Sequence, residues 1–390
     1  MEWMWAIAAT LLLCLSLPSS ASLDRGAGLC SVFVRPFGYP CLEHKVTTLD
    51  GFHVAVQRIP YGVRKGGALP RPAVLLQHGL LQGGDTWFLN PPSQSLGFIL
   101  ADEGFDVWVS NGRGTYWSRG HETLSIHDKK YWDWSWDELA EYDIPAILEF
   151  IHSSTSSEVF YVGHSQGTII GLAALTSPKT SRLVSGAAFL SPITYLDHIT
   201  SKLIRTAAFL YIDAICNAVG LYEFNLHNEI GVELVDKACA DPEVDCGNLL
   251  AAITGPNCCF NVSRIPYYLQ YEPQSTSLKN MQHLAQMIRK GTYERFDYGW
   301  VGNLRNYRQL HPPKYDIATI PALPVWMAYG GKDCLSDTKD VAHTLELLTC
   351  NPKVLYVEDY AHLDFILSTR ARDDVYNDMI AFLKGHFSTK

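Results

Sequence analysis

Two kinds of hydrophobic run alternate along much of this chain. Short continuous apolar runs, typical of strands that are buried on both faces of a sheet, occur at 73–77, 106–110, 159–162, 184–190, 323–329 and 353–357. Several segments between them place apolar residues on one helical face, for example Ile144, Ile147, Leu148 and Ile151. This alternation predicts an α/β fold with a mostly parallel central sheet, helices on both faces and functional sites at the carboxyl ends of the strands.

The alternation is interrupted in two places. Residues 45–60 alternate apolar and polar side chains around Asp50-Gly51, which favours a tight turn, and therefore predict a β-hairpin. Residues 197–306 contain apolar helical patches and several cysteines but no strand and helix alternation. We expect this segment to be an inserted, mainly helical cap or lid domain, which divides the core into residues 22–196 and 307–390.

The N-terminus has the pattern of a cleaved secretory signal. An apolar run at 6–17 is followed by Pro18-Ser19-Ser20-Ala21, so we expect residues 1–21 to be removed, although the run lacks a preceding Lys or Arg and an uncleaved anchor is the alternative. A second apolar stretch, 203–221, is interrupted by Arg205 and Asp213 and predicts no transmembrane span. The expected location is extracellular, with a vacuole or a lysosome-like lytic compartment as the alternative.

Composition narrows the possible partners. A formal net charge of -9 and the absence of a long basic run argue against nucleic acid. One of the ten cysteines lies in the signal, which leaves nine; we expect Cys30 to pair with Cys41 and, next, Cys239 with Cys246. No cysteine and histidine spacing indicates a metal, and we expect no cofactor. Asn261 begins a glycosylation sequon, which is compatible with secretion.

The strongest chemical motif is Gly163-His164-Ser165-Gln166-Gly167, between a predicted strand and a predicted helix. A serine on such a tight turn presents its hydroxyl above the sheet edge, and the two glycines are required because a Cβ there would meet neighbouring backbone. The motif therefore predicts that Ser165 is a nucleophile. We expect the side chain of the adjoining His164 to point away from the site and to serve in packing.

A serine nucleophile needs a base to accept its proton and an acid to orient that base. In hydrolases of this architecture the order along the chain is Ser, Asp or Glu, then His, each after a strand. Asp333 and His362 follow the strands predicted at 323–329 and 353–357. Other acids and histidines compete for these roles. We interpret Asp337 and Asp340 as helix-capping or surface acids, and Asp359 and Asp364 as acids that could orient a loop. We expect His343 and His386 to be solvated.

The transition state also needs donors for the developing oxyanion. We expect the amide of Gln166 to be one donor, and the amide of Leu80, in the loop His78-Gly79-Leu80, to be the other. The glycines of Gly83-Gly84 and Gly112-Arg113-Gly114 fit turns better than phosphate-binding loops. Other conspicuous side chains are interpreted as structural: Arg113 and Arg119 as supports of a loop, and Trp132, Trp134 and Trp136 as anchors of a helix that Ser135 and Glu138 cap.

Four segments together resemble the acid lipase family of gastric and lysosomal type: 76–81, 163–167, 331–333 and 360–365. Residues 45–60 and 111–114 are also similar to that family, and 254–261 resembles its plant branch. The resemblance implies an α/β-hydrolase with a cap and lid that hydrolyses esters of long-chain fatty acids. It assigns Ser165, Asp333 and His362 to the triad and Leu80 and Gln166 to the oxyanion hole. Gly83-Gly84 and Cys334 depart from the family pattern, and Cys334 is either paired, for instance with Cys350, or a free thiol.

We therefore hypothesise a secreted serine lipase that works through an acyl-enzyme on triacylglycerol or sterol ester at a lipid–water interface. Its apolar cap would contact the lipid surface peripherally. The alternatives are an esterase of soluble esters, an acyltransferase, and a hydrolase-fold lipid carrier whose triad is idle.

Overall fold

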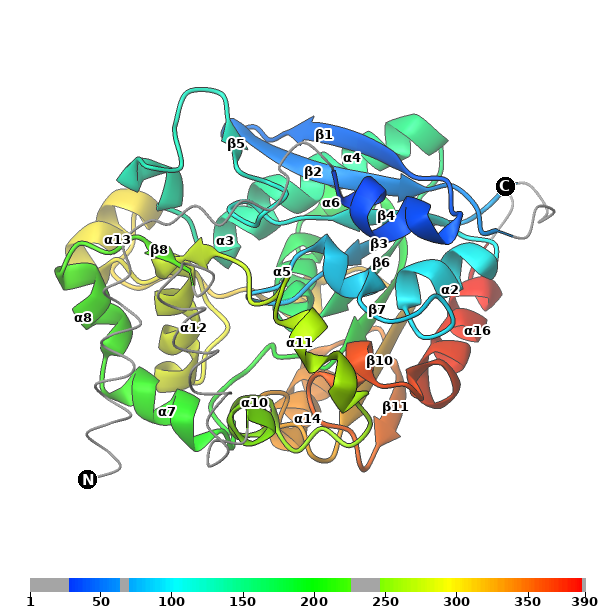
Figure 1. The fold of residues 1–390 in the computed structure, drawn as a ribbon. Helices are drawn as coiled ribbons and strands as arrows, with labels where there is room; N and C mark the ends of the chain where they lie inside the picture. Colours follow the sequence, from blue (N-terminus) through cyan, green and yellow to red (C-terminus); the bar gives the residue numbers. More distant parts are fainter. Residues whose placement is uncertain (1–27, 64–69, 226–245, 388–390) are drawn as a thin grey trace.

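The fold is described from a computed structural model, which covers residues 28–63, 70–225 and 246–387, without the side chains of 246–249. Its centre is a twisted sheet in the order β1-β2-β4-β3-β6-β7-β10-β11, with β5 beside β2 (Figure 1). The strands span Leu42–Thr47 (β1), Phe52–Ile59 (β2), Ala73–Gln77 (β3), Asp106–Ser110 (β4), Gly120–His121 (β5), Val159–His164 (β6), Val184–Leu190 (β7), Val325–Gly330 (β10) and Lys353–Val357 (β11). Every predicted strand is present, so the α/β prediction is confirmed.

Strand direction divides the sheet into two parts. Each neighbouring pair from β4 to β11 is parallel, whereas β1 and β2 are antiparallel and β2 also runs antiparallel to β4. The predicted hairpin turns at Asp50-Gly51, where Gly51 has a φ of 90° that favours glycine. The carboxyl ends of the parallel strands consequently lie at one edge, where the predicted site residues follow β3, β6, β10 and β11.

Both faces of β3, β4, β6, β7 and β10 are largely buried, which explains their continuous apolar sequences, whereas the edge strand β11 is mostly exposed. On β3, Leu75 faces one hydrophobic cluster, which also holds side chains of α4 and α5, while Leu76 faces a second cluster with side chains of α2 and α16. The helices that surround the sheet are α2 (Leu96–Asp102), α3 (Trp136–Glu138), α4 (Ile144–Thr155), α5 (Gln166–Leu175), α6 (Pro178–Ser181), α14 (Thr338–Leu347), α15 (Asp364–Leu367) and α16 (Asn377–Gly385). Short 3-10 and π segments lie between them, among them η1 (Cys30–Val34), η3 (Gly84–Phe88), η5 (Leu139–Asp143) and η8 (Arg372–Tyr376).

The chain between β7 and β10 has a different character. Its described part consists of α7 (Lys202–Phe209), α8 (Ile212–Ala218), β8 (Glu223–Phe224), α10 (Cys246–Thr254), α11 (Ile265–Tyr268), β9 (Thr276–Ser277), α12 (Leu278–Lys290) and α13 (Gly299–Tyr307). The strands β8 and β9 pair only with each other. Figure 1 shows α7, α8, α12 and α13 grouped beside the sheet. This segment reaches the nucleophile turn, because Asn280 on α12 accepts a hydrogen bond from the side chain of Gln166 at 2.9 Å.

Two disulfides join described cysteines. Cys30 pairs with Cys41, as predicted, and the sequence neighbours Cys258 and Cys259 pair with each other, which was not predicted. Cys334 and Cys350 are free thiols, so of the two alternatives for Cys334 the structure supports the free thiol and not a disulfide with Cys350. The predicted pair of Cys239 with Cys246 and the predicted signal at 1–21 lie outside the described residues and side chains.

No helix in 28–63, 70–225 or 246–387 combines the length and the apolar character that a bilayer requires.

Candidate active site

Ser165 stands at the turn between β6 and α5 with a φ of 53°, a left-handed value that is rare for serine. The glycines on either side permit this turn. An ideal Cβ on Gly163 would lie 2.6 Å from the carbonyl oxygen of Gly167, and one on Gly167 would lie 2.5 Å from the carbonyl oxygen of Gln77. Both distances are far inside van der Waals contact, which is the physical reason for the Gly-x-Ser-x-Gly pattern.

The three predicted triad residues form one hydrogen-bonded chain. Nε2 of His362 lies 2.7 Å from Oγ of Ser165, and Nδ1 of His362 lies 2.9 and 3.0 Å from the two carboxylate oxygens of Asp333. A carboxylate can only accept, so Nδ1 carries the hydrogen and Nε2 is left as the acceptor for the serine hydroxyl. All three side chains are buried.

Asp333 is held as an anion by its donors. Burial raises its pKa, but the His362 ring and the amides of Ser336 and Leu335, which donate at 2.8 Å each, outweigh burial and leave that pKa below its usual value. An ionised Asp333 can stabilise the imidazolium that forms when His362 accepts a proton.

The loop after β3 lies directly against Ser165. An ideal Cβ on Gly79 would lie 2.8 Å from the Cβ of Ser165, so only a glycine allows this approach. Within the described ranges, the amides of Leu80 and Gln166 make no hydrogen bond to another protein group. His78 braces the loop: its Nδ1 donates to the carbonyl of Gly79 at 2.8 Å, and its Nε2 accepts from the amide of Gly112 at 2.9 Å. The amides of Leu80 and Gln166 are therefore free to receive an oxyanion.

His164 does not point away from the site, and that prediction was wrong. Its ring centre lies 5.1 Å from the ring centre of His362, and its Nε2 donates to the carbonyl of His362 at 3.0 Å. Alternation of side chains along β6 would send neighbouring residues to opposite sides, but the left-handed φ of Ser165 ends that alternation. Burial lowers the pKa of His164 to about 3, so it acts as a neutral support of the His362 backbone.

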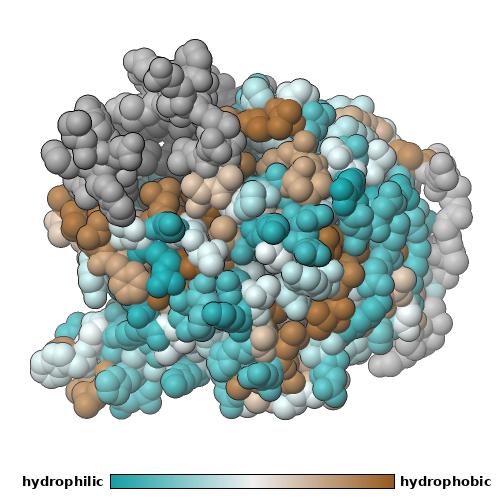
Figure 2. Space-filling view, turned by 90° about the horizontal axis from the view of Figure 1, so that it is seen from below, coloured by the Kyte–Doolittle hydropathy of each residue, from teal (hydrophilic) through white to brown (hydrophobic). Residues whose placement is uncertain are grey.

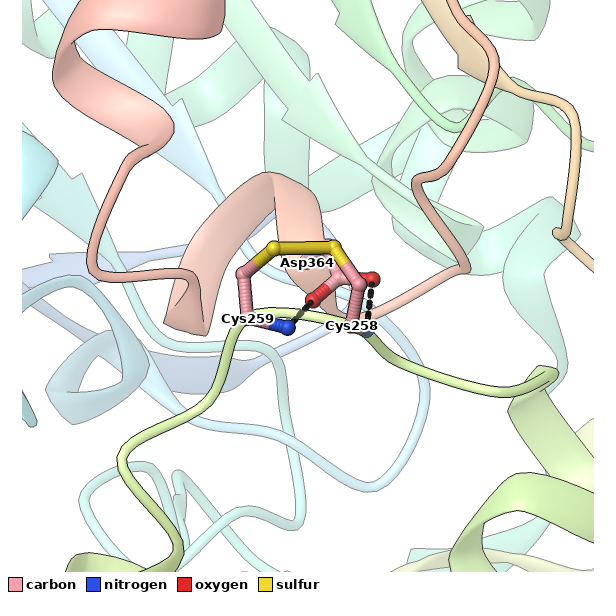
Figure 3. Close-up of side chains that lie close together, drawn as sticks. All are labelled: Cys258, Cys259 and Asp364. Carbon is pink, nitrogen blue, oxygen red and sulfur yellow. Dashed lines mark hydrogen bonds between the residues drawn. A yellow bond between two sulfur atoms is a disulfide. The ribbon is translucent and has the colours of Figure 1, made fainter.

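Asp364, two residues after His362, fixes the His362 loop to the segment at 254–259. Its Oδ2 accepts from the amides of Ala361 (2.9 Å) and Cys258 (3.1 Å), and its Oδ1 accepts from the amide of Cys259 (3.2 Å). Figure 3 shows the carboxylate facing the Cys258–Cys259 disulfide. The amide of His362 also donates to the carbonyl of Thr254 at 3.1 Å. In the sequence this segment was conspicuous for its two adjacent cysteines and for its resemblance to the plant branch of the family, and neither feature connected it to His362.

The remaining predicted residues have structural roles. Arg113 forms ion pairs with Asp50 and Asp143, and Arg119 donates to Ser275 at 2.9 Å, so both arginines support loops as expected. The indoles predicted to anchor a helix are buried: Trp132, Trp134 and Trp136. Ser135 and Glu138 form the predicted capping box.

Competing acids and the glycosylation sequon also have defined places. Asp337 caps the start of α14, as expected, whereas Asp340 is buried and accepts a hydrogen bond from Nδ1 of His198 at 2.6 Å. Asp359 is exposed. The side chain of Asn261 is exposed and accepts from the amide of Ser263 at 3.2 Å, so a glycan could reach it.

Two groups of side chains in the described ranges bring potential metal ligands within 4.8 Å of one another: Cys258, Cys259 and Asp364, and Asp197, His198 and Asp340. In the first group the sulfurs are bonded to each other and the carboxylate accepts from amides. Neither group contains Ser165, Asp333 or His362.

Comparison with known proteins agrees with this geometry. Residues 30–91 match the family described as a partial alpha/beta-hydrolase lipase region, and residues 72–211 match the alpha/beta hydrolase fold. A soluble variant of monoglyceride lipase from Saccharomyces cerevisiae has a similar fold, with a TM-score of 0.55 and 17% identity over 96% of this chain and all of that one. The chain is therefore an α/β-hydrolase of the carboxylic ester hydrolase class.

Sequence relatives define the family more narrowly. The chain is 48% identical to triacylglycerol lipase 1 of Arabidopsis thaliana, over 99% of this chain and 98% of that protein. It is 37% identical to human gastric triacylglycerol lipase, over 90% of each chain. The chain belongs to the acid lipase family, which confirms the resemblance noted in its motifs.

Proposed function

We propose that this lipase hydrolyses long-chain fatty acid esters, chiefly triacylglycerol, with Ser165 as the nucleophile, His362 as the base and Asp333 as its partner. The observation that carries the proposal is the continuous hydrogen-bonded chain from Asp333 through His362 to Ser165. The relatives named triacylglycerol lipase support the choice of substrate.

The reaction would proceed in two halves. Oγ of Ser165 attacks the ester carbonyl carbon while its proton passes to Nε2 of His362, and the carbonyl oxygen, now negative, is bound by the amides of Leu80 and Gln166. The C–O bond to the alcohol then breaks, and His362 gives its proton to the departing alcohol oxygen. A water molecule attacks the resulting acyl-serine by the same route, which releases the fatty acid and restores Ser165.

The segment 197–306 would act as a cap that contacts lipid. Large apolar side chains on α7 and α13 and at the two ends of α8 are exposed in spite of their character: Phe209 (51%), Tyr211 (55%), Val219 (64%), Trp300 (71%) and Leu304 (49%). Figure 2 shows apolar side chains that reach the surface along the edge where α7 and α8 lie. Exposed apolar groups of this kind suit a lipid–water interface, where burial in lipid removes them from water.

We propose that the protein works outside the cell, with a lytic compartment as the alternative location. The Cys30–Cys41 disulfide supports an oxidising environment, and the exposed sequon at Asn261 supports passage through the secretory route. The signal-like pattern at 1–21 supports the same route.

Fatty acid release from two substrates tests the proposed function. The substrates are an emulsion of long-chain triacylglycerol and a water-soluble short-chain ester, each with the wild type, Ser165→Ala and the control Ser153→Ala, which changes an exposed serine on α4. Release from the emulsion should fall by at least about 10⁴-fold in Ser165→Ala and should be unchanged in the control. Release from the soluble ester alone would show an esterase, and no release from either substrate by a folded wild type would refute the proposal and favour a carrier or an acyltransferase.

A further inference from the structure

A pair of buried carboxyl groups lies behind the loop that carries Leu80. Asp85 is in η3, a few residues after Leu80, and Glu272 is in the segment that follows α11. Asp85 is 1% exposed and Glu272 is partly exposed, and one carboxylate oxygen of each residue, Oδ2 of Asp85 and Oε2 of Glu272, is buried without a hydrogen-bond partner among the described groups. Neither residue belongs to the triad, so their burial needs another explanation.

The pair and its neighbour Gln274 hold the loop through three hydrogen bonds. Oε1 of Glu272 accepts from the amide of Gly83 at 3.0 Å, and the amide of Gln274 donates to the carbonyl of Leu81 at 2.7 Å. The side-chain amide of Gln274 donates to Oδ1 of Asp85 at 2.7 Å. These contacts also account for the unfamiliar Gly83, because an ideal Cβ on that residue would lie 2.3 Å from Nε2 of Gln274. The position of Leu80 therefore depends on Asp85 and Glu272.

No cation in the described ranges compensates the pair. The pKa of Asp85 is shifted by burial, a backbone amide and the side chains of Trp117 and Gln274. The pKa of Glu272 is shifted by burial, the charge of Asp85 and two backbone amides. No Lys, Arg or His of the described part of the chain acts on either carboxyl. Tyr267 faces Asp85 from α11, and Arg264, which stacks on Tyr267 at 4.7 Å, donates to the carbonyl of Leu89 instead of to either acid. Two adjacent buried anions without a cation would repel each other strongly.

We propose that Asp85 and Glu272 are positioning residues that form a proton-dependent latch on the oxyanion loop. While the pair carries a proton, it holds the amide of Leu80 beside Ser165. When both carboxyls are ionised, their repulsion breaks the contact with Gly83, releases the loop and lowers the rate. This inference rests on the proposed function, because the loop matters only if an oxyanion forms there. The direction agrees with the pKa values: burial raises that of Asp85 to about 7 and that of Glu272 well above its usual range.

The pH dependence of kcat/KM on a soluble ester tests the latch, with the wild type, Asp85→Asn, Glu272→Gln and the control Glu103→Gln, a partly exposed acid that follows α2. The amides imitate the protonated carboxyls, so they should remain active in acid. Wild-type activity should decline as the pH rises through about 7. In Asp85→Asn and Glu272→Gln the two groups can no longer both be ionised, so that decline should disappear or move upward by at least about one pH unit. Superimposable profiles, or folded amide variants that are inactive at every pH, would overturn the inference.

Two further measurements do not depend on turnover. Hydrogen exchange of the wild-type peptides that span 79–85 and 270–275, corrected for intrinsic rates, should be faster at pH 8 than at pH 5; equal protection would overturn the latch. Because the folded state binds the proton of Asp85 more tightly than the unfolded state does, wild-type stability should fall between about pH 4 and pH 7, and Asp85→Asn should reduce that fall. A wild type that hydrolyses no ester would refute the proposed function, whereas the exchange result would still decide the latch.

Discussion

The pKa values of the carboxyl groups on the two sides of Ser165 are shifted in opposite directions. On the His362 side, Asp333 accepts from a histidine ring and two amides, and its pKa is lowered in spite of complete burial. On the oxyanion-loop side, Asp85 and Glu272 each have an oxygen without a partner in the described part of the chain, and the pKa of each is raised. The pKa is thus lowered on one side, where a histidine ring and two amides donate, and raised on the other, where desolvation dominates.

Asp364 lies between these extremes and shows which contacts decide the outcome. Three amides donate to its carboxylate, yet burial still raises its pKa, and the negative charge of Asp333 adds to that shift. Amide donors alone therefore only offset desolvation in part, whereas a histidine that can become a cation reverses it. Asp333, which the proposed mechanism requires to be charged, is the acid that has such a partner.

Removing the charge of Asp333 should have the largest effect on activity, because it removes the contrast between the ionised acid beside His362 and the pair Asp85 and Glu272. In Asp333→Asn the amide cannot fix the Nδ1–H tautomer of His362, so kcat should fall by about 10³ to 10⁴-fold with a small change in KM. The matched control is Asp337→Asn, which removes the charge of the next acid along the chain, the N-cap of α14. Asn caps a helix about as well as Asp, so this variant should keep its stability and its kcat. The measurement is steady-state hydrolysis of a soluble ester. A loss below tenfold would show that another acid partners His362.

A smaller effect is expected from Asp364→Asn. This substitution keeps the shape of the side chain and replaces one acceptor oxygen with an NH₂ group, so it tests how much the carboxylate contributes. The new NH₂ group must face at least one of the three backbone amides, so the free energy of unfolding should fall by about 2 kcal/mol. The displacement of His362 that follows should lower kcat about tenfold. Thermal unfolding and kcat should be measured together. The control Asp359→Asn changes an exposed acid in the same loop and should match the wild type. If the two variants behaved alike, the carboxylate would have no part in holding the loop.

The predictions from sequence succeeded where the pattern was local. The strands, the hairpin at Asp50-Gly51 and the turn around Ser165 each depend on neighbouring residues, and the order of Ser165, Asp333 and His362 follows from strands whose carboxyl ends share one edge. Those local patterns therefore placed the three side chains that form the hydrogen-bonded chain.

The predictions failed or were silent where distant residues meet. Glu272 and Gly83 are 189 residues apart in the sequence, and no local pattern connects them. Asp364 was expected, with Asp359, to be an acid that could orient a loop, but its donors could not be predicted, because Cys258 and Cys259 lie on a segment whose position depends on tertiary packing. His164 was misplaced because strand alternation does not continue through a residue with a left-handed φ.

The smallest effect is expected from removing the Cys258–Cys259 disulfide, which tests its contribution apart from that of the nearby Asp364 carboxylate. The bond joins adjacent residues, so it restricts the unfolded chain little, and the double variant Cys258→Ser and Cys259→Ser should lose about 1 kcal/mol of stability while kcat stays within about twofold. The amides that bind Asp364 belong to the backbone and survive the change. Combining this variant with Asp364→Asn gives a cycle in which a coupling above about 0.5 kcal/mol would show that the disulfide orients those amides. If the cysteine variant alone lost as much activity as Asp364→Asn, the ring of the disulfide, and not the carboxylate, would be what holds His362 in place.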